Sequence, residues 1–294
     1  MVYTAKKVSK YWSSIRCSIV VVGWICAHSL LAQPLDFGKP LGIPLELSGS
    51  FAELRANAFH AGLDFRTQQR EGLPVFAVAD GTLSRVVVSS VGYGKAVYIS
   101  HANGMMSVYA HLSGFIPFIE ELVRKQQYAK QTFELDINFP EEPLRFKKGD
   151  LIGYSGNTGS SGGPHLHFEL RNQNGTNALN PTLWGYTVKD NLPPPISAFV
   201  VYPHGHRSLV NGRQTPLVLP VGCRGGDCTL QPDTISVFGQ FAFGIEAIDK
   251  TDGSVNILGL HAMRVFIDDE LKFGWKLDDM PFSKELEHHL LYAI

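Results

Sequence analysis

Residues Gly153 to Glu169 have the sequence GYSGNTGSSGGPHLHFE, a glycine-rich turn that leads into a segment of alternating character. If that segment is a β-strand, successive side chains point to opposite faces of a sheet. His165 and His167 then share one face, whereas Leu166 and Phe168 point the other way, toward a core. Two imidazoles on one strand face are well placed to bind a single metal ion. This stretch therefore predicts both a strand of a packed sheet and part of a metal site.

Two further segments contribute residues that can bind a metal. Residues 57–65 read NAFHAGLDF, in which His60 and Asp64 share one face if the segment is extended. Gly62 between them leaves space beside the two side chains. His111 stands at the end of a strand-like run. Imidazole and carboxylate groups both bind zinc, and the ordered set of HxxxD, a strand-end histidine and HxH together predicts a zinc site.

The surrounding sequence, from Gly38 to Trp184, is typical of short strands separated by tight turns. Strand-like runs occur at Val75–Val78, Leu83–Val88, Ala96–Ser100, Ser107–Ala110 and His165–Leu170. The turn signals between them are Asp80-Gly81, Gly92-Tyr93-Gly94 and Asn103-Gly104. Strands so closely spaced predict a mainly β fold, with an antiparallel β-sheet or sandwich in this part of the chain.

One segment breaks the strand pattern. In residues 117–131 apolar side chains recur at helical spacing with charged residues between them (Phe118, Ile119, Leu122 and Val123). We expect an amphipathic helix here, inside a helical insertion of about residues 115–148. The helix has two interpretations, an ordinary packing element and a wall of a substrate groove.

Pro193-Pro194-Pro195 is a stiff break and marks a candidate domain boundary. Strand-like runs follow it at Ile196–Tyr202, Phe241–Ile248 and Met263–Ile267. We therefore expect one domain over residues 33–190 and a β-rich C-terminal domain over residues 191–294. An immunoglobulin-like fold is one candidate for the C-terminal domain, and contact with a partner protein is one hypothesis for its role. The chain ends in an apolar run without a helix stop signal, so we expect a fragment of a longer protein.

The first 32 residues differ in charge from the rest of the chain. They contain four basic residues and no acid, followed by an apolar run from Cys17 to Ala32. This pattern predicts a secretory signal peptide over residues 1–32, with an uncleaved membrane anchor as the alternative. Cleavage would leave 22 basic and 27 acidic residues and a formal net charge of −5.

The predicted export and the acidic net charge of the remaining chain bear on which partners the protein can bind. A protein without a basic excess is a poor candidate for nucleic-acid binding, and we expect contact with the membrane only through the signal segment. Cys223 and Cys228 flank a Gly-Gly turn. In an exported protein this spacing predicts a local disulfide.

Residues 158–167 read TGSSGGPHLH, and together with the HxxxD of His60 and Asp64 they resemble the motifs of the lysostaphin/LytM-type zinc metallopeptidases. The resemblance covers about residues 45–185. Gly162 stands where that family commonly has threonine, a difference that removes a hydroxyl but no ligand. The resemblance implies a duplicated hybrid motif fold, with an antiparallel β-sheet core and an open groove.

By the same resemblance, the matching residues have expected roles. His60, Asp64 and His167 would bind one Zn²⁺ ion per chain and leave a fourth position open to water. His165 would act as the general base on that water. His111 would stabilise or orient the developing oxyanion, or assist proton transfer.

Other polar residues have two interpretations each. Asn57 and Tyr109 are either substrate-groove residues or ordinary packing residues. Glu169 shares the strand face of the HxH pair and would either support a metal ligand or form a carboxylate at the rim. His204-Gly205-His206 lacks an HxxxD partner, so we do not expect it to bind metal. His101 is expected at a hairpin turn.

The favoured function is that of an exported zinc metalloendopeptidase that hydrolyses peptide cross-links of bacterial peptidoglycan. Its location would be the periplasm, the cell envelope or the extracellular space. Zinc lowers the pKa of a bound water to about 7, and a histidine can carry the proton to the leaving amine. The alternatives are a non-enzymatic cell-wall module that activates a partner hydrolase and a zinc peptidase that acts on proteins. The intact ligand set favours the enzyme.

Overall fold

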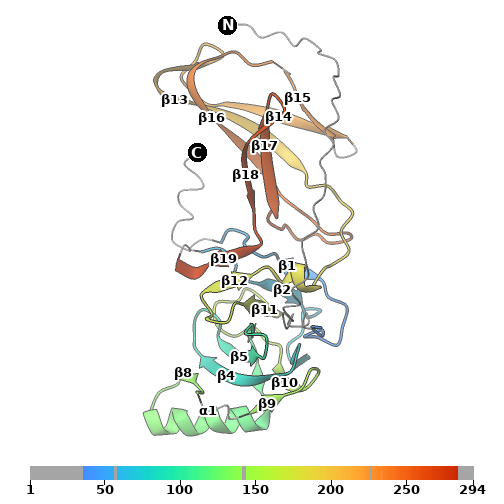
Figure 1. Ribbon diagram of the computed structural model, residues 1–294, viewed down its shortest axis with the longest axis vertical. Coiled ribbons are helices and arrows are strands. Elements are labelled where there is room, and N and C mark those ends of the chain that lie inside the picture. The colour runs from blue at the N-terminus through green and yellow to red at the C-terminus, as the bar shows by residue number, and fades with distance from the viewer. Residues whose placement is uncertain (1–35, 56–57, 141–143, 225–226, 233, 284–294) are drawn as a thin grey trace, which may run out of the picture. The chain divides into compact units, whose positions relative to one another are not determined.

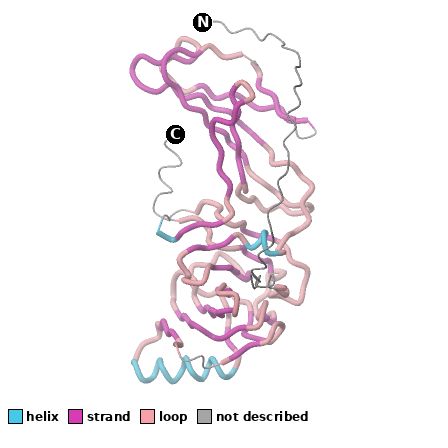
Figure 2. Tube along the Cα trace, in the orientation of Figure 1, coloured by secondary structure: helices cyan, strands magenta, loops and turns pink. Residues whose placement is uncertain are grey.

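The computed structural model describes residues 36–55, 58–140, 144–224, 227–232 and 234–283. The predicted signal segment, the apolar run at the end of the chain and the candidate groove residue Asn57 lie outside the described residues. The described part is mainly β, as the sequence predicts (Figure 1). Strands joined by turns make up most of it, and α1 is the one α-helix among the described residues (Figure 2).

A ten-stranded antiparallel sheet carries the candidate site. Its main path runs in the order β1 (Leu47–Gly49), β2 (Leu63–Arg66), β11 (His165–Arg171), β6 (Met106–Ala110), β5 (Lys95–His101), β4 (Gly81–Val88) and β8 (Leu135–Asn138). Three short strands join it: β9 (Arg145–Phe146) on β4, β12 (Asn177–Leu179) on β11 and β19 (Asp279–Pro281) on β12. Because β11 lies between β2 and β6, the sheet brings together the three sequence segments that contain the candidate ligands.

The alternation expected in the HLHFE segment is present in β11. Leu166 and Phe168 are fully buried and belong to the main hydrophobic core. That core also includes residues of a smaller sheet formed by β3 (Pro74–Phe76), β10 (Leu151–Tyr154) and β7 (Gly114–Phe115). The two histidines of β11 therefore lie on the face that points away from this core.

The inserted helix is also present. α1 spans Pro117–Lys130 and ends where Gln131 adopts a left-handed conformation with φ 50°. Ile119 and Val123 are buried and join the main core, as expected of a packing helix. No helix that the structure describes, α1 and the short 3₁₀ turn at Pro181–Trp184 included, is long and apolar enough to cross a membrane.

The C-terminal part of the chain is β-rich, as predicted. A four-stranded antiparallel sheet has the order β15 (Asp227–Leu230), β14 (Leu217–Arg224), β13 (Ile196–Val210) and β16 (Val237–Ala247). A separate hairpin is formed by β17 (Ala262–Ile267) and β18 (Glu270–Lys276). Cys223 and Cys228 are paired across β14 and β15 and form the predicted disulfide. The immunoglobulin-like fold stays a prediction.

The last described strand returns to the first sheet. β19 pairs with β12, and the side chain of Asn180 donates to the backbone oxygen of Leu277 at 2.8 Å. The segment that follows β18 in sequence is therefore part of the sheet that carries the site. The domain boundary near residue 190 stays a prediction, since the ten-stranded sheet includes residues from both sides of it.

Candidate metal centre

The register of β2 against β11 places two of the candidate ligands side by side. Asp64 and His167 are direct partners across the antiparallel pair. His60 lies just before β2, and Gly62 allows the connecting chain to pass against β11. A Cβ atom at Gly62 would lie 2.2 Å from the backbone oxygen of Phe168. The glycine is therefore required by close packing of two chain segments, and this packing brings His60 over the strand pair.

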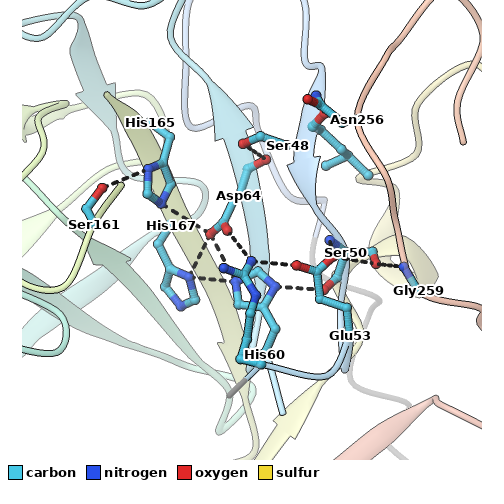
Figure 3. Close-up of polar contacts among 12 residues, drawn as sticks. Ser48, Ser50, Glu53, His60, Asp64, Ser161, His165, His167, Asn256 and Gly259 are labelled. Carbon is cyan, nitrogen blue, oxygen red and sulfur yellow. Dashed lines mark hydrogen bonds and ion pairs between the residues drawn. The ribbon is translucent and has the colours of Figure 1, made fainter. Parts of the chain in front are cut away.

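Three acceptor atoms converge at this point (Figure 3). Nε2 of His60 lies 3.0 Å from Oδ1 of Asp64 and 3.0 Å from Nδ1 of His167. Nδ1 of His167 lies 2.9 Å from the same carboxylate oxygen. All three side chains are buried. Among the described residues, this trio is the one group whose ligand atoms lie close enough to share a metal ion.

The hydrogen-bond partners of the outer ring nitrogens fix the tautomers of His60 and His167, and so determine which nitrogens carry lone pairs toward Asp64. Nδ1 of His60 lies 2.6 Å from the backbone oxygen of Ser50, which can only accept, so Nδ1 carries the hydrogen. Nε2 of His167 lies 2.8 Å from Oε1 of Glu169 and donates to that carboxylate. When both rings are neutral, their inner nitrogens therefore present lone pairs toward the carboxylate of Asp64. Three acceptors without a donor between them fit a metal cation, and two imidazoles with one carboxylate suit zinc.

Asp64 is kept ionised by its surroundings. Burial alone would raise the pKa of this carboxyl, but in the metal-free protein its interactions with His60, His165 and His167 outweigh burial and hold the pKa well below its usual value. The second carboxylate oxygen accepts from Nη2 of Arg55 at 2.8 Å, and Arg55 also pairs with Glu53 at 2.6 Å. One oxygen of Asp64 is thus fixed by Arg55, and the other faces the two histidines.

His167 competes for a proton when no metal is bound. Burial would lower the pKa of His167, but hydrogen bonds to Asp64 and Glu169 outweigh burial and raise the pKa to about 9. Burial would likewise raise the pKa of Glu169, but the charge of Arg171 and the bond from His167 lower it to about 2. The inner nitrogen of His167 therefore faces a strongly anionic environment, which favours either a proton or a metal cation.

The two remaining histidines flank the trio. Nδ1 of His165 donates to the backbone oxygen of Gly163 at 2.8 Å, so the neutral ring has its lone pair on Nε2, which lies 3.4 Å from Oδ1 of Asp64. Nδ1 of His111 donates to the backbone oxygen of Thr158 at 2.8 Å. The ring centroids of His165 and His111 are 4.7 Å apart. Both residues therefore offer Nε2 as a proton acceptor.

His111 has an unusual backbone and a low pKa. Its φ of 59° lies in the left-handed region, which residues other than glycine rarely adopt. Its backbone N–H donates to the oxygen of Tyr93 at 2.9 Å, which helps to hold this conformation. Burial, and then the nearby charges of His167 and His165, lower the pKa of His111 to about 4. His111 is therefore neutral at neutral pH.

The glycine-rich turn holds the carbonyl that orients His111. Gly94 and Gly159, both with positive φ, lie against each other, and a Cβ atom at Gly94 would lie 2.4 Å from the carbonyl carbon of Thr158. The Thr158 hydroxyl donates to the oxygen of Leu112 at 2.8 Å. By contrast, a Cβ atom at Gly162 would meet nothing within 4 Å. Gly162 therefore borders open space.

Two residues with two interpretations each, Tyr109 and Glu169, are both buried in the structure. Tyr109 is fully buried, its ring packs on Phe168, and its hydroxyl accepts from the backbone N–H of Val78 at 2.9 Å. It is a core residue, because it shares the inward face of the sheet with Phe168. Glu169 is fully buried and binds His167, so it supports a ligand and does not form a rim.

The other histidines lie apart from the trio. His101 ends β5 and is buried, with Nε2 at 2.9 Å from the hydroxyl of Ser107. His204 and His206 are exposed on β13. Sequence reasoning missed Ser50 and Arg55, because a carbonyl and an arginine before an HxxxD motif carry no recognisable signal. It also missed Arg171, which strand alternation from Glu169 could have placed on the same face.

Comparison with known proteins identifies relatives of this part of the chain. Residues 58–132 and 139–181 match the model of Peptidase family M23. An uncharacterized metalloprotease of Haemophilus influenzae is 38% identical over 122 residues, covering 42% of this chain and 20% of that protein. The peptidoglycan DD-endopeptidase ShyA of Vibrio cholerae is 36% identical over 112 residues, covering 38% of this chain and 20% of that protein.

Among solved structures, the catalytic domain of lysostaphin from Staphylococcus simulans aligns with 48% of this chain and 90% of its own length. The sequence identity is 25% and the TM-score is 0.35. The alignments with the two curated relatives span about a fifth of the length of each relative.

Proposed function

We propose that this chain is an exported zinc metalloendopeptidase that hydrolyses peptide cross-links of bacterial peptidoglycan, a proposal supported by the match of residues 58–132 and 139–181 to the model of Peptidase family M23. The observation that carries the proposal is the convergence of three buried acceptors beside two histidines that each offer an unprotonated nitrogen. A module without catalytic function would not require this complete arrangement.

Three residues of the chain would bind the metal, and a fourth would hold one of these ligands in place. His60, Asp64 and His167 would hold one zinc ion through Nε2, Oδ1 and Nδ1. When bound, zinc lowers the pKa of a water molecule and polarises the scissile carbonyl. Arg55 keeps the Asp64 carboxylate in place through its second oxygen.

Proton transfer falls to the flanking histidines. Nε2 of His165 would accept the proton of the attacking water, and the resulting imidazolium would donate it to the leaving amine. Gly163 stabilises both forms, since its carbonyl accepts from Nδ1 throughout. His111 is neutral and also offers Nε2 as an acceptor, so it would assist proton transfer by accepting a hydrogen bond. This tautomer does not suit donation to an oxyanion.

The proposed substrate and location rest on separate observations. The relative from V. cholerae is named as a peptidoglycan DD-endopeptidase, which supports peptidoglycan as the substrate. The basic and apolar first 32 residues support export to the periplasm or the cell envelope. The acidic balance of the remaining chain gives no support to nucleic-acid binding.

The proposal is tested with the purified full chain and isolated peptidoglycan. We expect about one zinc per chain, and new free amines and shortened muropeptides after digestion. His165→Ala should abolish cleavage with zinc retained, whereas His167→Ala should lose both. His206→Ala, an exposed histidine outside the site, is the matched control. Cleavage of protein substrates in place of peptidoglycan, or full cleavage by both site variants, would contradict the proposal.

A further inference from the structure

Beyond His167, the same face of β11 carries a buried ion pair. Glu169 is fully buried and Arg171 is 8% exposed. Oε1 of Glu169 accepts from His167 at 2.8 Å, and Oε2 accepts from Nε of Arg171 at 2.6 Å. The imidazole, the carboxylate and the guanidinium thus form one continuous chain of hydrogen bonds along alternate positions of a single strand.

The guanidinium at the end of this chain is itself held from several sides. Nη2 of Arg171 donates to the hydroxyl of Tyr93 at 3.1 Å. Its central carbon lies 4.3 Å from the ring centroid of Phe282 and 5.4 Å from that of Tyr98. Aromatic faces attract a cation and fix its plane. Arg171 therefore has little freedom to turn away from Glu169.

Burying the Glu169–Arg171 ion pair costs desolvation free energy that apolar residues in the same space would not cost. Removing a carboxylate and a guanidinium from water costs several kcal/mol for each ion, and well-packed apolar residues often do as well or better for stability. The pair is best explained by the role of Oε1 of Glu169, the carboxylate oxygen that does not contact Arg171. That oxygen lies against the outer nitrogen of His167, and such partners fix the tautomer and ring orientation of metal-binding histidines.

We propose that Glu169 and Arg171 are positioning residues, which hold His167 with its hydrogen on Nε2 and its lone pair on Nδ1 directed at the metal. Glu169 acts on the ligand directly, and Arg171 acts by fixing the carboxylate. The inference rests on the proposed function, because it takes His167 to be a metal ligand.

The same sheet contains a matched pair for comparison. Arg85 donates to Asp136 at 2.7 and 2.6 Å, and its guanidinium also lies over Tyr98, with 4.8 Å between its central carbon and the ring centroid. This pair joins β4 and β8 and is partly exposed. Arg85→Met therefore controls for the loss of an arginine–carboxylate pair and an aromatic contact without any contact to His167.

The first test measures metal affinity in the full chain by competition between Zn²⁺ and a chromophoric chelator. Arg171→Met should weaken zinc binding by about 10- to 100-fold, the range typical for loss of such partners. Arg85→Met should stay within about two-fold of the unmodified chain. Equal zinc affinities of these two variants would overturn the role of Arg171.

The second test separates positioning from folding with two double variants. Glu169→Gln with Arg171→Met keeps a neutral acceptor for His167, whereas Glu169→Leu with Arg171→Met removes it; neither leaves a buried charge. We expect similar melting temperatures without metal, but zinc binding at least about 10-fold weaker in the leucine variant, with an altered Co²⁺ absorption spectrum. Should the leucine variant unfold, Glu169→Gln alone serves, because its amide must face either His167 or Arg171 with a donor.

Each result has a distinct meaning. Equal zinc affinity and equal Co²⁺ spectra in the two double variants would overturn the inference, as would unchanged affinity in a folded Glu169→Gln variant. Failure of the unmodified chain to bind zinc would instead overturn the proposed metal site. Because none of these measurements uses peptidoglycan cleavage, an unexpected substrate would leave their interpretation intact.

Discussion

The backbone N–H of Gly259 donates to the hydroxyl of Ser50 at 2.9 Å, and the carbonyl of the same serine accepts from the outer nitrogen of His60 at 2.6 Å (Figure 3). A loop that precedes β17 in the sequence thus contacts Ser50, which in turn contacts the candidate metal ligand His60. Asn256 of the same loop donates to the oxygen of Leu47 at 2.7 Å. The carbonyl that sets the tautomer of His60 therefore depends on contacts made late in the chain.

This relationship predicts a long-range effect of Gly259→Val. A Cβ atom at this position would lie 3.0 Å from Cβ of Glu53 and 3.1 Å from its Cα, so a larger side chain must displace the Ser50–Glu53 turn. We expect the free energy of unfolding to fall by about 1–3 kcal/mol and zinc affinity to fall with it. Gly222→Val is the control, since open space surrounds that position. Equal zinc affinity in the two variants would show that the turn does not act on His60.

The metal-free protein should lose stability as the pH rises. The pKa of His167 is about 9 in the folded chain, because hydrogen bonds to Asp64 and Glu169 outweigh burial, and about 6.5 in an unfolded chain. The folded state therefore holds an extra proton, whose stabilisation is fully present below about pH 6.5. It is lost as the pH approaches 9, by roughly 3 kcal/mol in total.

Urea unfolding of the chelator-treated chain at several pH values measures this effect. The zinc-loaded chain is the control, because a metal on Nδ1 of His167 leaves no proton there to lose. A metal-free chain whose unfolding free energy stays level from pH 6.5 to 9 would argue against protonation of His167.

How far the sequence could predict this site depends on how local each signal is. The faces of His165, His167 and Phe168 follow from alternation within one strand, and the structure confirms them. Tyr109 had two interpretations, groove or packing, and alternation within its own strand could not decide between them. Tyr109 pairs with Phe168 across the sheet, and the sequence of neither strand alone predicts this register.

The direction of the His111 side chain could not be predicted from strand alternation either. Continued alternation after Tyr109 would direct His111 into the core, but the left-handed turn at His111 sends its side chain to the site instead. The contribution of Ser50 is likewise beyond sequence reasoning, because any residue has a carbonyl. Ligand types and strand faces could be predicted, whereas register, backbone conformation and backbone acceptors required the fold.

Substitution of His111 should separate proton transfer from metal binding. His111→Ala removes an acceptor at Nε2 but none of the three converging ligand atoms. We expect kcat to fall by about 10²-fold or more, with about one zinc per chain retained. His204→Ala, an exposed histidine on β13, should change neither quantity. Loss of zinc in His111→Ala would place His111 among the ligands.

Two glycines of one turn should respond differently to alanine. Gly92 and Gly94 both have positive φ, at 59° and 63°, so either substitution imposes similar backbone strain. Open space surrounds Gly92, whereas a Cβ atom at Gly94 would lie 2.4 Å from the carbonyl carbon of Thr158. Gly92→Ala should therefore cost about 1 kcal/mol of stability and leave cleavage intact.

Gly94→Ala should also move the Thr158 carbonyl, which orients His111 through a 2.8 Å hydrogen bond. We expect kcat to fall by about 10-fold or more with zinc content unchanged, because the three ligand atoms lie on other segments. Cleavage rates and zinc content of the two variants, measured side by side, check this. If both alanines lower kcat equally, backbone strain alone accounts for the loss, and close packing of Gly94 against Thr158 has no role in orienting His111.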